Sequence, residues 1–178
     1  MKTLEFRRHS LKGQSGMLSP AGIEYARKIG AEQLKGKGFT VVVTTVHLRT
    51  SQTVCAFIEG AGDFAIKDHI VEAGLCPLDK AALWNVLFNR SEQSLEALLA
   101  TDPTFVRAEA RSMAEAVKRI VDGLPKDSKV LIVSHGVLTE ATVYGLTGQI
   151  LQPLRECEGC ELEVNDGEYR VTNEFRLP

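Results

Sequence analysis

The sequence has little excess charge of either sign. Its 21 Lys and Arg residues nearly balance its 23 Asp and Glu residues, and the formal net charge is -2 at pH 7. A broad nucleic-acid-binding face requires a clustered excess of Lys and Arg, so we expect no nucleic-acid partner. A small anion site is still compatible with this balance, because a few buried arginines do not show in a nearly neutral total.

Long apolar runs are also missing. No stretch approaches the roughly 18 apolar residues of a membrane span, and residues 1–9 contain too few apolar side chains for a signal peptide. We therefore expect a cytoplasmic protein with no membrane partner. Internal repeats, low-complexity tracts and Gly/Ser/Pro linkers are absent as well, which predicts one globular domain over residues 1–178.

Cysteine is scarce, with four in the chain. Cys157 and Cys160 form a CxxC pair, a spacing found in zinc and redox sites. Structural zinc sites commonly use two such pairs, and the second pair is missing. We interpret these residues as unpaired thiols near a surface turn and expect neither a metal nor another cofactor.

What the sequence does contain is an alternation of apolar, β-branched runs with helix-like segments. Strands are predicted at residues 4–6, 40–44, 64–70 and 129–134, with a hairpin at 160–164 and 169–175 around Asn165-Asp166-Gly167. Helices are predicted at residues 20–34, 48–58, 103–121 and 138–146, and residues 72–90 are expected to be mostly irregular with some helix. This order predicts a three-layer α/β/α sandwich with a mostly parallel central sheet.

The ends of the predicted strands carry side chains suited to phosphate chemistry. Arg8 and His9 follow the first strand, His135 follows the strand at 129–134, and Arg49 opens the helix after the strand at 40–44. Ligands of such sheets bind beyond the carboxyl ends of the strands. Arginine offers a planar fork that matches phosphate, and a neutral imidazole is a competent nucleophile. Positive neighbours favour the neutral form of His9.

Four motifs in this order resemble the histidine phosphatase superfamily, which includes the cofactor-dependent phosphoglycerate mutases. Arg8-His9-Ser10 matches the family's Arg-His-Gly, with Ser in place of the last Gly, and Leu18 to Gly22 matches Leu-Thr/Ser-x-x-Gly. Thr45 to Thr53 matches Ser-x-x-x-Arg-x-x-Gln-Thr, with Val46 in place of the usual Pro, and Val130 to Gly136 matches the apolar strand into Ser-His-Gly. The resemblance covers residues 1–148 and implies a phosphoglycerate mutase-like fold.

The resemblance also implies roles for individual residues. His9 is expected to accept the phosphoryl group, and Arg8, Arg49 and His135 to form the phosphate pocket. The backbone N–H of Gly136 and the Ser15 hydroxyl are expected to add phosphate contacts.

The resemblance further implies a proton donor for the leaving oxygen. The family places a Glu or Asp some two to three dozen residues after the second arginine, and Glu72 is our candidate, with Asp68 and Asp79 as fallbacks. Glu140, on the first turns of the helix after His135, either faces the pocket or acts as a helix cap.

The predicted function is that of a metal-independent phosphatase acting through a phosphohistidine on His9 and releasing inorganic phosphate. The substrate is expected to be a phosphorylated small molecule or a phosphoprotein. Few cations lie in the loop segments, which argues against a highly phosphorylated substrate; they are Lys12, Lys80 and Arg90. The sequence gives no signal for an oligomeric state.

Three other functions compete with this prediction. A phosphoglycerate mutase needs a larger lid than the short interval between Arg49 and His135 offers. A non-catalytic phosphate- or phosphoprotein-binding module on the same fold is disfavoured because the full set of two imidazoles and two guanidinium groups is present. A zinc protein built on Cys157 and Cys160 would need ligands that the sequence scatters too widely.

Overall fold

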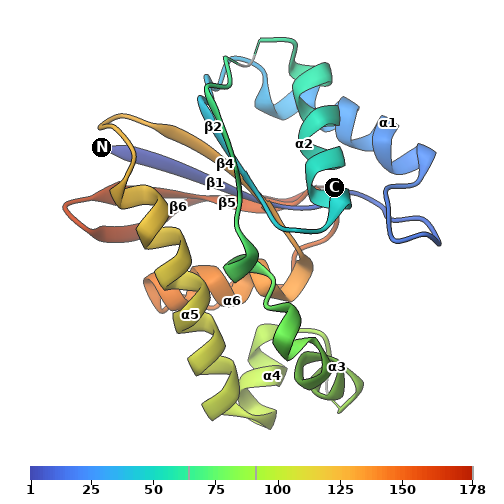
Figure 1. Cartoon of the computed structure of the whole chain (residues 1–178), viewed down its shortest axis with the longest axis vertical. Helices are drawn as coiled ribbons and strands as arrows, with labels where there is room; N and C mark the ends of the chain where they lie inside the picture. The colour runs from blue at the N-terminus through green and yellow to red at the C-terminus, as the bar shows by residue number, and fades with distance from the viewer. Residues whose placement is uncertain (64, 91, 178) are drawn as a thin grey trace.

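The computed structural model describes residues 1–63, 65–90 and 92–177. A six-stranded sheet crosses the molecule in the order β3-β2-β4-β1-β5-β6 (Figure 1). The strands are β1 (Lys2–Arg8), β2 (Val41–Thr44), β3 (Asp68–Val71), β4 (Lys129–Ser134), β5 (Gly159–Asn165) and β6 (Glu168–Phe175). β3, β2, β4 and β1 run parallel, whereas β5 pairs antiparallel with both β1 and β6. The predicted α/β architecture with a mostly parallel sheet is confirmed.

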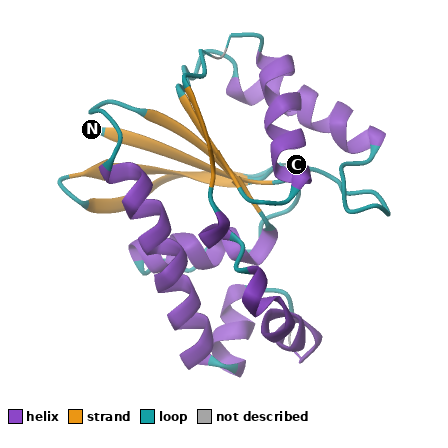
Figure 2. Cartoon of the chain, in the orientation of Figure 1, coloured by secondary structure: helices purple, strands orange, loops and turns teal. Residues whose placement is uncertain are grey.

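Helices cover both faces of the sheet (Figures 1 and 2). One face carries α1 (Pro20–Ile29), its π-helical continuation η1 (Gly30–Leu34) and α2 (Leu48–Ala61). The other face carries α5 (Pro103–Asp122) and α6 (Gly136–Thr147), with α3 (Ala81–Arg90) and α4 (Leu95–Thr101) beyond them. These layers form the predicted sandwich.

The hydrophobic core consists of two clusters, one on each face of the central strands. Val42, Leu131 and Val133 pack in the cluster under α1 and α2, while their neighbours along the chain pack in the larger cluster under α5 and α6. Successive side chains of a strand point to opposite faces, and both faces are covered here. This explains why β2 and β4 are almost continuously apolar runs.

Local signals explain several helix ends. Ser19 caps α1 by accepting a hydrogen bond from the backbone N–H of Gly22 at 3.0 Å, and Pro20 follows as the first helical residue. Asp102 caps α5 in the same way through Phe105 N, at 3.0 Å. Gly36, two residues after the end of η1, has a φ of 77°, which favours glycine.

The region between β3 and α5 differs most from the sequence-based expectation. The predicted strand at 64–70 begins at Phe64, which lies outside the described residues, and β3 occupies Asp68–Val71. The segment expected to be mostly irregular contains two 3₁₀ turns, η2 (Ala73–Leu75) and η3 (Leu78–Lys80), followed by the full helix α3. Helix α4 has no counterpart in the prediction. Trp84 organises this region by stacking near Phe88 and meeting Phe105 edge-on.

Two further observations concern the exclusions made from sequence. Over the described ranges, no helix is long and apolar enough to cross a membrane. Cys157 and Cys160 are free thiols, as expected, but both are fully buried. Cys157 lies in a turn, as expected, but neither thiol reaches the surface, and Cys160 lies on β5 beside the central β1 strand, in register with Phe6.

Candidate active site

The candidate site lies where three parallel strands end together. Arg8, the last residue of β1, is in register with Ser134 of β4, and Thr44 of β2 is in register with Val133. The next residue along each chain segment therefore emerges at the same edge of the sheet. This edge holds His9, His135 and Thr45.

The two histidines predicted from sequence are neighbours. The ring centroids of His9 and His135 lie 5.2 Å apart with an interplanar angle of 67°. Both side chains are buried, with 6% and 7% exposure. The structure thus brings together two imidazoles from opposite ends of the chain.

His9 has a defined tautomer. Its Nδ1 lies 2.6 Å from the backbone carbonyl oxygen of Ser10. A carbonyl oxygen only accepts, so Nδ1 carries the proton, and Nε2 keeps its lone pair. Burial lowers the pKa of His9 to about 4, and the charges of Arg49 and Arg8 act in the same direction. The ring is therefore neutral at pH 7 and presents one unprotonated nitrogen.

His135 is held from both sides. Its Nδ1 accepts a hydrogen bond from Arg49 Nη2 at 3.1 Å, so its proton is on Nε2, which lies 2.9 Å from Thr45 Oγ1. Burial lowers the pKa of His135 to about 2, and the Arg49 charge adds to that shift. His135 is also the N-cap of α6, which begins at Gly136.

Arg8 lies across the first turn of α6. A Cβ on Gly136 would stand 3.4 Å from Arg8 Cζ, so the absence of a side chain permits this packing. Arg8 donates from Nη1 to the carbonyl of Leu154 and from Nη2 to Glu156 Oε1, both at 2.7 Å. The N-terminal N–H groups of a helix favour anions, and the guanidinium reinforces that preference.

Arg8 and Arg49 each have a hydrogen-bond donor without a partner. Among the described residues, Arg8 Nε and Arg49 Nε are buried and have no hydrogen-bond partner. Buried donors are nearly always paired in folded proteins, and an exception calls for a missing ligand or water. Two unpaired guanidinium donors beside a helix N-terminus form a site for an oxyanion.

A cavity of about 470 Å³ opens from this anion site. Its polar end is formed by Arg8, Arg49, His135 and the backbone of Gly136. Residues of the segment between β3 and α4 form much of the rest of its wall, together with Val137, Leu138, Pro153 and Leu154; those from the segment are Cys76, Pro77, Leu78, Ala81, Trp84, Asn85, Phe88 and Gln93. The segment predicted to be mostly irregular therefore shapes this cavity.

Several expected site residues lie elsewhere. Ser15 is in an exposed turn and does not line the cavity. Glu72 does not line it either: its Oε1 accepts a hydrogen bond from Gly74 N at 2.7 Å and caps η2. The fallback residues Asp68 and Asp79 are exposed and outside the cavity wall. The hydrogen bond to Gly74 holds the Glu72 carboxylate in the turn after β3. The spacing of the sequence motif gave no sign of this bond.

Among the described residues of the cavity wall, Glu140 is the only one with a carboxylate side chain. Its side chain is buried, Oε1 accepts a hydrogen bond from Leu154 N at 2.8 Å, and Oε2 has no partner. Burial raises the pKa of Glu140 to about 7. Of the two roles considered from sequence, facing the pocket is the one that the structure favours, since Glu140 lines the cavity and its Oε1 accepts a hydrogen bond from Leu154 on a separate segment.

Three residues near the anion site were missed from sequence: His47 and Cys76 line the cavity, whereas Glu156 lies outside its wall. Glu156 pairs with Arg8, and the imidazole of His47 lies 5.1 Å from that of His135, measured between ring centroids. Cys76 follows η2 on the cavity wall. Two of these had a usable signal: His47 immediately precedes the helix that carries Arg49, and Cys76 closely follows a strand of the parallel sheet.

Comparison with known proteins decides the family. The model of the histidine phosphatase superfamily (branch 1) matches residues 7–173. The chain belongs to the histidine phosphatase superfamily. No curated protein sequence gave a significant match.

Solved structures with the same fold confirm the architecture of this chain. A phosphoserine phosphatase from Entamoeba histolytica, in complex with 3-phosphoglyceric acid, matches with a TM-score of 0.67 and 16% identity over 99% of this chain and 98% of the other. A mycobacterial glucosyl-3-phosphoglycerate phosphatase in complex with VO3 matches with a TM-score of 0.68 and 18% identity over 97% and 98%. A phosphoglycerate mutase from Bacillus anthracis matches with a TM-score of 0.65 and 18% identity over 96% and 91%. At these identities the likeness establishes the fold alone.

Proposed function

We propose that this histidine phosphatase superfamily chain is a metal-independent phosphatase that transfers a phosphoryl group to His9 and then to water. One observation carries the proposal: a neutral imidazole with a free Nε2 lone pair lies beside His135 and two guanidinium groups that have unpaired donors. We further propose that residues 1–178 form a single catalytic domain. It would act in the cytoplasm, where its free cysteines stay reduced.

The first step uses the anion site as it stands. The substrate phosphoryl group binds between Arg8, Arg49 and the N-terminal N–H groups of α6. Nε2 of His9 attacks phosphorus in line, the N–P bond forms, and the P–O bond to the leaving group breaks. The guanidinium groups stabilise the charge that spreads over the equatorial oxygens. His135 positions Arg49 by accepting a hydrogen bond from its Nη2.

We assign the proton donor to Glu140 instead of Glu72. A general acid works best when its pKa is near the working pH, and burial raises the pKa of Glu140 to about 7. Protonated Glu140 gives its proton to the leaving oxygen. In the second step its carboxylate takes a proton from water as the water attacks the phosphohistidine, which releases inorganic phosphate and restores His9.

Arg8 already has a carboxylate partner before substrate binds. Glu156 Oε1 accepts from its Nη2 at 2.7 Å, and both side chains are 30% exposed. A phosphate entering the site competes with this carboxylate for the same guanidinium. Glu156 therefore weakens the resting affinity for anions and holds Arg8 in position between turnovers.

The cavity supports a small substrate with one phosphoryl group. Beyond the anion site its wall is largely apolar and aromatic, with Leu78, Trp84 and Phe88, and Lys12 is the further cation among the described wall residues. The similar structures include proteins named for phosphoserine and for glucosyl-3-phosphoglycerate. A small phosphate monoester fits this chemistry, and phosphohistidine on a protein is the second substrate class.

The test measures hydrolysis of p-nitrophenyl phosphate in the presence of a metal chelator. His9→Ala is expected to lose activity to background, whereas His69→Ala, at an exposed histidine on β3, is expected to retain it. Rapid quenching of the wild type is expected to trap an acid-labile, base-stable phosphoenzyme that His9→Ala does not form. Full activity of His9→Ala would reject the proposal. Isomer exchange on addition of a bisphosphoglycerate would identify a mutase instead.

A further inference from the structure

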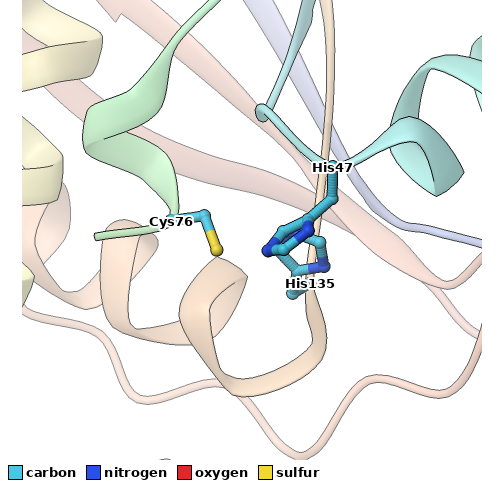
Figure 3. A group of neighbouring side chains, drawn as sticks. All are labelled: His47, Cys76 and His135. Carbon is cyan, nitrogen blue, oxygen red and sulfur yellow. The ribbon is translucent and has the colours of Figure 1, made fainter. Parts of the chain in front are cut away.

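A group of three metal-ligating side chains lies in the cavity wall. The ligand atoms of His47, Cys76 and His135 all lie within 4.8 Å of one another. In Figure 3 the Cys76 sulfur points toward the imidazoles of His47 and His135. The three residues come from separate segments, since His47 precedes α2, Cys76 follows η2 and His135 precedes α6. The fold, and not local sequence spacing, creates this group.

The donor set matches the preferences of zinc. Imidazole and thiolate ligands suit Zn²⁺, with Zn–N distances of about 2.0–2.1 Å and Zn–S of about 2.3 Å, which places ligand atoms about 3.3–3.6 Å apart in a tetrahedron. The ligand atoms now lie within 4.8 Å of one another, so side-chain rotations have to bring the more distant atoms closer together when the ion binds. Three protein ligands leave a fourth position, and it faces the cavity because all three residues line it.

Metal binding at this place conflicts with the resting contacts of His135. Both of its ring nitrogens are engaged, Nδ1 with Arg49 and Nε2 with Thr45. Coordination requires the release of one contact. Arg49 and Cys76 line the same cavity, and the Arg49 guanidinium contacts His135 Nδ1 at 3.1 Å. A divalent cation bound between Cys76 and His135 therefore repels the Arg49 guanidinium from the anion site.

We propose that His47, Cys76 and His135 form an inhibitory Zn²⁺ site whose occupation excludes productive phosphate binding. Coordination replaces the S–H bond of Cys76 by a Zn–S bond, and the proton goes to solvent. The ion takes His135 away from Arg49 and so disturbs the guanidinium that holds the phosphoryl group. The binding part of this proposal is independent of the proposed function, and the inhibition part rests on it.

The site is distinct from the CxxC pair. Cys157 and Cys160 are fully buried, and neither belongs to a group of metal-ligating residues in the part of the chain that the structure describes. Cys55 on α2 is an exposed free cysteine outside the cavity wall. It provides a matched control for Cys76.

The binding test uses the purified full chain and Co²⁺ as a spectroscopic probe, followed by Zn²⁺ in competition with a chromophoric chelator. The wild type and Cys55→Ser are expected to bind one equivalent and to show a thiolate-to-cobalt charge-transfer band. Cys76→Ser is expected to lose that band and at least tenfold in zinc affinity, and His47→Gln to lose affinity while keeping the band. Equal zinc binding by Cys76→Ser and the wild type would overturn the site.

The inhibition test compares the hydrolysis of p-nitrophenyl phosphate with and without Zn²⁺, each variant relative to its own zinc-free rate. Zinc is expected to inhibit the wild type and Cys55→Ser, with recovery after chelation, and to spare Cys76→Ser. Zinc bound to an active wild type without inhibition would overturn the exclusion. If no variant hydrolyses phosphate, the proposed function fails, and the cobalt spectra still decide whether the site exists.

Discussion

Nη2 of Arg49 donates a hydrogen bond to Nδ1 of His135 over 3.1 Å. The bond joins the first turn of α2 to the end of β4, two elements that are far apart in the sequence. It fixes the protonation of the imidazole, because a guanidinium group has no acceptor. It also leaves Arg49 Nε buried and unpaired, so the same side chain that orders His135 still has a donor for an anion.

Removal of the Arg49 guanidinium is expected to cost a large part of the transition-state stabilisation. Arg49→Ala should lower kcat/KM by roughly 100- to 1,000-fold, about 2.7–4 kcal/mol, as for other positioned charge donors. Arg49→Lys should recover little, because an ammonium group lacks the planar fork. Steady-state kinetics checks this, with Arg27→Ala on the exposed side of α1 as the control. A loss of less than threefold in Arg49→Ala would contradict the assigned role.

Kinetics of two variants can distinguish the two candidate proton donors, Glu140 and Glu72. Glu140→Gln should lower kcat on a phosphate ester with a poor leaving group by roughly 100- to 10,000-fold, the usual contribution of general acid catalysis. The loss should shrink for p-nitrophenyl phosphate, whose leaving group needs little protonation. Glu72→Gln should leave the turnover nearly unchanged on both substrates. The reverse ranking of the two variants would restore Glu72 as the donor.

The raised pKa of Glu140 also predicts that the folding stability depends on pH. Its pKa rises from 4.5 to about 7 on folding, so its favourable contribution is complete below pH 4.5 and is lost as pH increases through about 7. The integrated effect is at most about 3 kcal/mol. Urea unfolding of the wild type and Glu140→Gln from pH 5 to 8 should show a difference that grows in favour of the glutamine variant. Parallel curves would show that Glu140 is ionised in the folded protein.

Glu156 is expected to restrain anion binding. Glu156→Gln removes the carboxylate from Arg8, and inorganic phosphate should then inhibit more strongly as a competitor. The gain should stay within about fivefold, since a partly exposed ion pair contributes about 1 kcal/mol or less. Glu115→Gln, which changes an exposed pair with Lys118 on α5, serves as the control. Weaker phosphate inhibition in Glu156→Gln would show that this carboxylate instead supports the binding geometry of Arg8.

Local chemistry explains why much of the fold was predictable. The apolar β-branched runs at β2 and β4 have no competing local structure, and Ser19-Pro20 is a strong helix start. The segment from β3 to α4 was harder to predict, because its helices are short and depend on packing around Trp84. Propensity is a weak guide where tertiary contacts decide.

The sequence by itself determined which residues end the central strands: Arg8 and His9 after β1, and His135 after β4. Parallel pairing then places the ends of neighbouring strands at one edge, so the order of the motifs was sufficient to predict the pair of imidazoles. Only the tertiary structure decided which carboxylate faces the cavity and which side chains surround His135. The direction and burial of Glu72, Glu140 and Cys76 depend on turns and on elements distant in sequence, and a capping hydrogen bond or a neighbouring helix decides them.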